Sequence, residues 1–89
     1  MATVRPTERA REQIANLPFD VRETLDLAVA DLAAEPREAG YQLQGTRAGE
    51  WCMPVLEYRV GYLIQGPNDQ EVVIFQVVYR GSAYPRTRR

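Results

Sequence analysis

The side chains in this sequence that could do chemistry are arginines, tyrosines and carboxylates. The 89 residues include no histidine and no lysine, so all 11 basic residues are arginines. These absences exclude imidazole acid–base catalysis, histidine–metal sites, Schiff-base chemistry and lysine-containing phosphate loops. The lone cysteine, Cys52, lacks the histidine that usually activates a cysteine nucleophile. We therefore expect no metal and no cofactor, and we expect any chemistry to rely on guanidinium groups.

A predicted β-hairpin near the C-terminus sets the relative positions of several of these side chains. Residues 58–65 alternate between apolar and polar types, which predicts a half-buried strand. Residues 71–79 are nearly all apolar, as expected of a central strand covered on both faces. The sequence Gly-Pro-Asn-Asp at 66–69 predicts the turn between them.

Two arginines and one tyrosine are predicted to meet at the open end of this hairpin. If Gln65 and Glu71 flank the turn, Arg59 lies opposite residue 77, within a residue or two. Arg80 follows the same end of the sheet, and Tyr84 comes shortly afterwards. Two guanidiniums and a phenol make a plausible cradle for a phosphate. The alternative is three unrelated solvated residues at the margin of a sheet.

Two helices are predicted to precede the hairpin. Thr7 is a candidate N-cap, and the apolar residues that follow it recur at helical spacing up to Pro18. Pro18 ends this helix and suits the first turn of a second one, which begins at Phe19. The second helix stops at Glu35, because the residue before Pro36 is pushed out of the α region. The short link between the two helices predicts an antiparallel hairpin.

The remaining segments are predicted to be short strands and a connector. Residues 2–5 are a candidate edge strand, and residues 51–56 are another candidate strand, which contains Pro54 and so belongs at an edge or a bulge. Residues 37–50 form a glycine-containing connector. Tyr41 and Leu43 are expected to anchor this connector to the core.

Length and composition indicate one domain over residues 1–89, with a short strand or arm at 1–6 and a basic tail at 81–89. The hydrophobic fraction of 45% and the charged fraction of 26% are those of an ordinary globular protein. No apolar run is long enough to span a membrane, and a single cysteine fits a reducing compartment, so we expect a cytoplasmic protein. Residues 1–58 hold six arginines and ten acids, whereas residues 59–89 hold five arginines and two acids. This basic C-terminal third permits a local site for an anion.

The order of these segments resembles the RelE/ParE family of bacterial toxins from type II toxin–antitoxin pairs. The resemblance covers roughly residues 3–86 and is carried by residues 17–22, 32–36, 43–45, 58–62 and 77–80, together with Trp51 and Tyr84. It implies an α+β fold in which an N-terminal helical hairpin packs on a small twisted, mostly antiparallel β-sheet. It also implies a cognate antitoxin as partner.

The resemblance implies two competing activities. RelE-like members cut mRNA in the ribosomal A site, where the 2′-hydroxyl attacks the adjacent phosphate, and ParE-like members instead inhibit DNA gyrase. In the first case Arg59 would stabilise charge on the scissile phosphate, Arg80 would stabilise the leaving 5′-oxygen, and Tyr84 would stack on or orient the nucleotide. A third possibility is a degenerate toxin homologue that only binds its antitoxin.

The sequence departs from the RelE-like pattern at the positions of the expected base. Relatives usually carry basic residues seven and five positions before the strand arginine, and here these positions hold Cys52 and Pro54. Glu57 is a candidate base next to the cluster, or a solvated carboxylate in a turn. The position of Tyr79 is often histidine in relatives. The sequence therefore leaves the nuclease, the gyrase inhibitor and the inactive homologue open.

Overall fold

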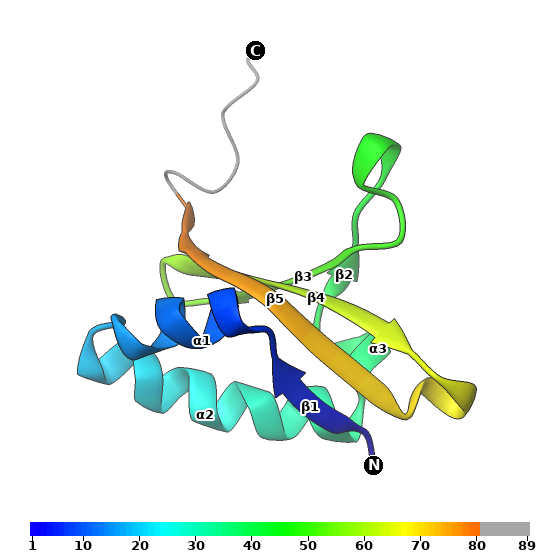
Figure 1. The fold of residues 1–89 in the computed structure, drawn as a ribbon, viewed down its shortest axis with the longest axis horizontal. Helices are drawn as coiled ribbons and strands as arrows, with labels where there is room; N and C mark the ends of the chain where they lie inside the picture. The colour runs from blue at the N-terminus through cyan, green and yellow to red at the C-terminus, as the bar shows by residue number, and fades with distance from the viewer. Residues whose placement is uncertain (81–89) are drawn as a thin grey trace.

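The fold is a five-stranded mixed sheet with helices on one face (Figure 1). The structure is a computed structural model and describes residues 1–80. The helices are α1 (Glu8–Ala15), α2 (Phe19–Ala34) and α3 (Pro36–Ala39). The strands are β1 (Thr3–Pro6), β2 (Tyr41–Gln42), β3 (Trp51–Val55), β4 (Tyr58–Gln65) and β5 (Glu71–Tyr79), in the sheet order β1-β5-β4-β3-β2. The pairs β2–β3, β3–β4 and β4–β5 are antiparallel and β1–β5 is parallel, so the predicted α+β class with a mostly antiparallel sheet is confirmed.

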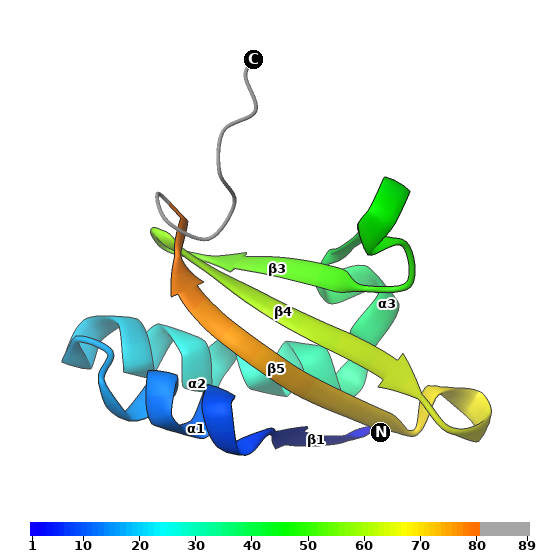
Figure 2. The same ribbon diagram turned by 45° about the horizontal axis from the view of Figure 1, so that its top comes forward.

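Local sequence signals predicted the start of α1 and both ends of α2, whereas α1 ends at Ala15, before the Pro18 that was predicted to end it. The Thr7 hydroxyl accepts a hydrogen bond from the backbone N–H of Ala10 at 3.1 Å, which caps the first turn of α1. Pro18 precedes α2, and Glu35, just before Pro36, ends it. Figure 2 shows α1 and α2 lying side by side beneath the sheet, while the 45–50 loop rises on the other side. The two faces of the sheet therefore have different surroundings, and we call the face away from α1 and α2 the open face.

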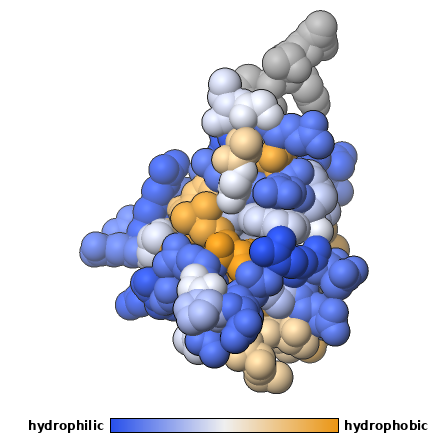
Figure 3. Space-filling model, turned by 90° about the vertical axis from the view of Figure 1, so that its right-hand side faces the viewer, coloured by the Kyte–Doolittle hydropathy of each residue, from blue (hydrophilic) through white to orange (hydrophobic). Residues whose placement is uncertain are grey.

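The hydrophobic core lies between the sheet and the helices. The alternation predicted for β4 is confirmed, because the side chains of Val60 and Tyr62 are fully buried in this core. The other core residues come from both layers and are Ala2, Ala10, Leu25, Leu32, Trp51, Met53, Val55, Val72, Ile74 and Val77. Seen from the side that carries the β4–β5 turn, the surface shows a small hydrophobic area enclosed by hydrophilic side chains (Figure 3). No helix within residues 1–80 is long and apolar enough to cross a membrane.

The connector predicted at 37–50 contains short elements that its sequence does not signal. α3 fills its start, β2 adds a two-residue strand to the sheet, and a 3₁₀ turn spans Gly45–Arg47. The expectation that Tyr41 anchors the connector to the core is wrong, since 45% of its surface is exposed. The Tyr62 hydroxyl ties the connector down instead, by donating to the Pro36 carbonyl at 2.9 Å. A buried partner far away in the sequence therefore holds this segment.

A β-bulge interrupts the pairing of β4 with β5. Gln65 pairs with Glu71, as the turn predicts, and the same register holds as far as Tyr62 opposite Ile74. Gly61 then pairs with Gln76, so Phe75 is an extra residue on β5. A Cβ atom on Gly61 would lie 2.9 Å from the Phe75 ring, which shows that the ring packs over the glycine. From Gly61 back to Tyr58, each residue of β4 therefore lies opposite the β5 residue one position later in the sequence than it would without the bulge.

Past the residues of β5 that pair with β1, a side chain of α1 accepts a backbone hydrogen bond from β5, which leads to a first prediction. The Gln13 side-chain carbonyl accepts a hydrogen bond from the backbone N–H of Val77 at 2.7 Å. Gln13→Ala is expected to lower the free energy of unfolding by about 1–3 kcal/mol, because a partly buried N–H loses its partner. Urea unfolding measures this loss, and hydrogen exchange of the Val77 amide should accelerate. Arg9→Ala, on the exposed side of the same helix, is the control, and an equal loss in both variants would contradict the prediction.

The turn between β3 and β4 contains a strained residue, which leads to a second prediction. Leu56 has a φ of 54°, a conformation that favours glycine at the first position of a two-residue hairpin turn. Its side chain is 55% exposed, so little burial is lost on removing it. Leu56→Gly is expected to raise the free energy of unfolding by about 0.5–1 kcal/mol, since relief of strain exceeds the added entropy of the unfolded chain. Leu56→Ala keeps the strained backbone and should not raise the thermal unfolding temperature. Equal gains in stability for Leu56→Gly and Leu56→Ala would refute strain as the cause.

Candidate phosphate-binding site

Arg59 lies on the open face of the sheet. It pairs with Pro54 on β3 and with Val78 on β5, and its neighbours on β4, Tyr58 and Val60, point into the core. Its Nη1 donates a hydrogen bond to the Tyr41 hydroxyl at 2.8 Å. The guanidinium is therefore held near the edge of the sheet formed by β2.

Arg80 directly follows β5 and continues its pairing with the β3–β4 turn. Its backbone N–H donates to the Glu57 carbonyl at 2.8 Å, and its Nε lies 3.2 Å from Glu57 Oε1. Both side chains are more than half exposed, so this ion pair is worth less than about 1 kcal/mol. A phosphate could therefore displace the carboxylate at little cost.

The bulge changes which residue of β5 lies opposite Arg59, and with it the face from which Arg80 is inferred to start. Arg59 is opposite Val78, and β5 ends at Tyr79, one residue before Arg80. Continuing the alternation of β5 one residue beyond its end, we infer that the Arg80 side chain starts from the same face as Arg59. In the predicted register, with residue 77 opposite Arg59, alternation would have placed Arg80 on the helix side. Diagonal neighbours in a sheet lie about 7–8 Å apart, with their Cβ atoms somewhat closer, a span that two arginine side chains can close around one phosphate.

The positions that carry basic residues in RelE-like sequences offer no base here. Cys52 lies on the open face but is fully buried, and Pro54 has no ionisable group. Among residues 1–80 no group of three or more histidine, cysteine, aspartate or glutamate side chains could hold a metal ion. The third predicted site residue, Tyr84, lies outside the described residues.

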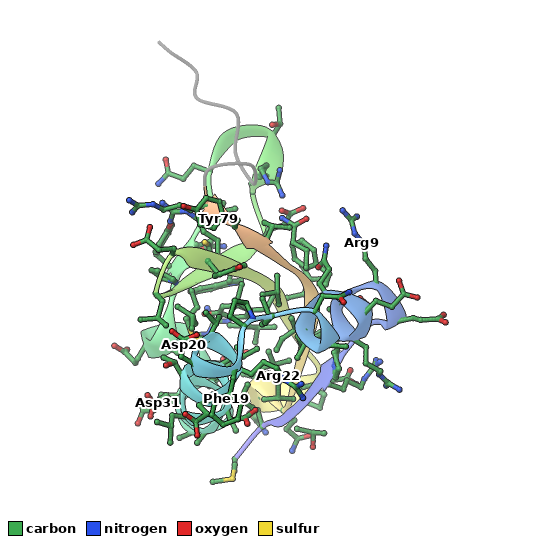
Figure 4. The ribbon with its side chains drawn as sticks, turned by 90° about the vertical axis from the view of Figure 1, so that its left-hand side faces the viewer. Arg9, Phe19, Asp20, Arg22, Asp31 and Tyr79 are labelled. Carbon is green, nitrogen blue, oxygen red and sulfur yellow. The ribbon has the colours of Figure 1, made fainter. Side chains whose placement is uncertain are left out.

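Tyr79 is oriented differently from the two arginines. Its ring packs edge-on against Tyr58, with ring centroids 5.6 Å apart, and alternation places both on the helix side of the sheet. Figure 4 shows Tyr79 at the end of β5, while Phe19, Asp20 and Asp31 come from α2 in the lower part of the view. Tyr79 is thus placed to pack at the rim of the sheet rather than to join Arg59.

Sequence reasoning missed Tyr41 as a member of the site. It pairs with Cys52 at the edge of the sheet, and its hydroxyl contacts Arg59. The pKa of the Tyr41 phenol is raised by a hydrogen bond with Cys52 and by burial, and the charge of Arg59 opposes this shift. The phenol is therefore neutral near pH 7. No local pattern signals this contact, because the two residues are joined only by the pairing of three strands.

Similarity to solved structures shows the class of protein to which this fold belongs. No protein-family model matches the chain, and no curated protein matches it. A chain of the toxin–antitoxin complex RelBE2 from Mycobacterium tuberculosis is 32% identical, with a TM-score of 0.78 and coverage of 89% of this chain and 98% of that chain. The chain therefore belongs to the RelE family of type II toxins.

More distant structures share the same fold. A chain of the archaeal RelE–RelB complex from Pyrococcus horikoshii OT3 is 24% identical, with a TM-score of 0.73 and coverage of 92% of this chain and 98% of that chain. The isolated E. coli RelE toxin is 22% identical, with a TM-score of 0.75 and coverage of 93% and 88%. At these identities the similarity supports the fold, and the chemistry has to be argued from the residues of this chain.

Proposed function

We propose that this protein is a ribosome-dependent mRNA endoribonuclease that acts in the cytoplasm and is silenced by a cognate antitoxin. The observation that carries the proposal is the position of Arg59 on the open face of β4, opposite the end of β5, which Arg80 directly follows. Two guanidiniums on an exposed surface suit a phosphate whose charge increases in the transition state. Membership of a toxin family supports the antitoxin as partner.

In the proposed reaction the 2′-oxygen forms a bond to phosphorus while the bond from phosphorus to the 5′-oxygen breaks. The 2′-hydroxyl loses a proton and the 5′-oxygen gains one. Arg59 stabilises charge on the non-bridging oxygens, and Arg80 stabilises the leaving oxygen once it exchanges Glu57 for the phosphate. Tyr84 is proposed to stack on or orient a base of the mRNA. The Glu57 carboxylate is then released beside the site, where it is the nearest described candidate for a base.

The experiment that tests this proposal maps the 5′ ends of an mRNA by primer extension in a translating extract. The purified protein is expected to produce cuts within codons that occupy the ribosomal A site, and none when the same RNA is offered without ribosomes. An absence of cuts in both samples overturns the nuclease proposal. Purification with the product of the adjacent reading frame tests the antitoxin, because a stable complex should abolish the cuts.

Gyrase inhibition is the second candidate, and the chemistry of positions 52 and 54 favours it. A buried cysteine and a proline leave the open face without the basic pair expected of a nuclease. A supercoiling assay with DNA gyrase separates the two functions. Inhibition at micromolar protein together with uncut mRNA would select the gyrase inhibitor. Inactivity in both assays, with an antitoxin still bound, would select the degenerate homologue.

A further inference from the structure

Tyr41 is held in a fixed place at the edge of the open face. A Cβ atom on the preceding Gly40 would lie 2.4 Å from the Cys52 carbonyl oxygen and 2.5 Å from the Tyr62 hydroxyl. The backbone at Gly40 therefore approaches β3 at a distance that only glycine permits. Pairing with Cys52 then places Tyr41 on the same face as Arg59.

The contact between Tyr41 and Arg59 restricts the direction of the guanidinium. Arg59 Nη1 donates to the Tyr41 hydroxyl at 2.8 Å, a short hydrogen bond between a charged donor and a neutral acceptor. The guanidinium is a rigid plane with five N–H groups, so fixing one edge determines where the other edge points. Arg59 is the arginine to which the proposed function gives the scissile phosphate.

The phenol is suited to hold a cation beside an anionic substrate. Hydrogen bonding with Cys52 and burial raise its pKa, and this outweighs the opposing effect of Arg59. Because the phenol stays neutral at physiological pH, it orients Arg59 without adding a negative charge that would repel a phosphate. A neutral phenol is also a poor acceptor for the proton of a 2′-hydroxyl, so its role is not that of a base.

We infer that Tyr41 is a positioning residue of the phosphate-binding site, which pre-orients the guanidinium of Arg59 on the open face. The catalytic consequence rests on the proposed nuclease function, whereas the ordering of Arg59 does not. Ordering the side chain in the free protein reduces the conformational entropy that transition-state binding would otherwise cost. Loss of the Tyr41 hydroxyl should therefore change kcat more than KM.

The first measurement follows the Arg59 side chain in the protein alone. Nitrogen relaxation of the arginine Nε–H groups gives an order parameter for Arg59, whose signal is assigned by its loss in Arg59→Lys. Tyr41→Phe removes only the hydroxyl and should lower this order parameter markedly, while Tyr79→Phe should leave it unchanged. An Arg59 signal that is equally ordered in Tyr41→Phe overturns the inference, whether or not the protein cleaves mRNA.

The second measurement connects the contact to cleavage. Tyr41→Phe is expected to reduce kcat about tenfold with little change in KM, as the loss of one hydrogen bond to a charged group would do. In an Arg59→Ala background the same substitution should have no further effect, because the residue through which it acts is gone. Additive losses would overturn the inference. Absence of cleavage by the wild-type protein would refute the proposed function, and the relaxation result would still decide the role of Tyr41.

Discussion

If the proposed nuclease function holds, replacing Arg59 with alanine is expected to slow A-site cleavage by about 10²–10³-fold, the loss typical of removing one preorganised group that stabilises transition-state charge. The reason is the position of Arg59 on the open face, where its guanidinium donates a hydrogen bond to Tyr41 and Arg80 follows the end of the neighbouring strand. Arg59→Lys should recover only part of the rate, because an ammonium group cannot make two parallel hydrogen bonds to a phosphate. The rate of codon-specific cuts in a translating extract measures both variants.

Arg5→Ala is the matched control for the removal of one exposed arginine. Arg5 lies on β1 at the far edge of the sheet, where its Nε is 2.6 Å from Glu71 Oε2. Its ion pair is exposed and contributes little to stability, so the rate should stay within about twofold of the wild type. Equal losses in Arg5→Ala and Arg59→Ala would mean that overall charge matters and that no specific site exists. Thermal unfolding of each variant checks that the loss is not one of folding.

Replacing Gly40 with alanine is expected to lower the free energy of unfolding by about 3 kcal/mol. The added methyl group would overlap the Cys52 carbonyl oxygen, which is backbone and cannot move without disturbing β3. It would also meet the hydroxyl of Tyr62, a fully buried side chain that donates to the Pro36 carbonyl. For a domain of this size such a loss lowers Tm by roughly 10–20 °C, which calorimetry can measure.

Gly45→Asn is the control for this prediction. A Cβ atom at Gly45 has no neighbour within 4 Å, and asparagine tolerates its φ of 71°. The change in stability should therefore stay within about 0.5 kcal/mol. If Gly40→Ala is as stable as Gly45→Asn, the close approach of β2 to β3 described for Gly40 is wrong.

Local signals in the sequence were enough to predict the helices and the hairpin. A threonine cap defines the start of α1 and two prolines define the ends of α2, because capping and proline geometry act within a few residues. The alternation along β4 likewise predicted which of its side chains are buried. The family resemblance added the α+β arrangement, which the structure confirms.

The short elements of the connector could not be predicted in the same way. β2 has only two residues, and α3 has a single turn, so neither produces a periodic pattern. Their positions depend on a buried hydroxyl, that of Tyr62, and on a close backbone approach at Gly40. Both contacts join residues far apart in the chain. Tyr41 was therefore assigned to the core, although it lies beside Arg59.

By itself the sequence determined which chemistry is available to this protein, because it has arginine as its only strong cation and lacks histidine and lysine. It also placed Arg59 and Arg80 at the same end of a hairpin, since the turn sets the pairing to within a residue. Only the tertiary structure decided which residue of β5 lies opposite Arg59, and so which face Arg80 is inferred to share. Strand side chains alternate with a period of two, so one extra residue, Phe75, exchanges the faces of everything beyond it. The ring of that residue packs over Gly61, a contact between two strands that no local pattern encodes.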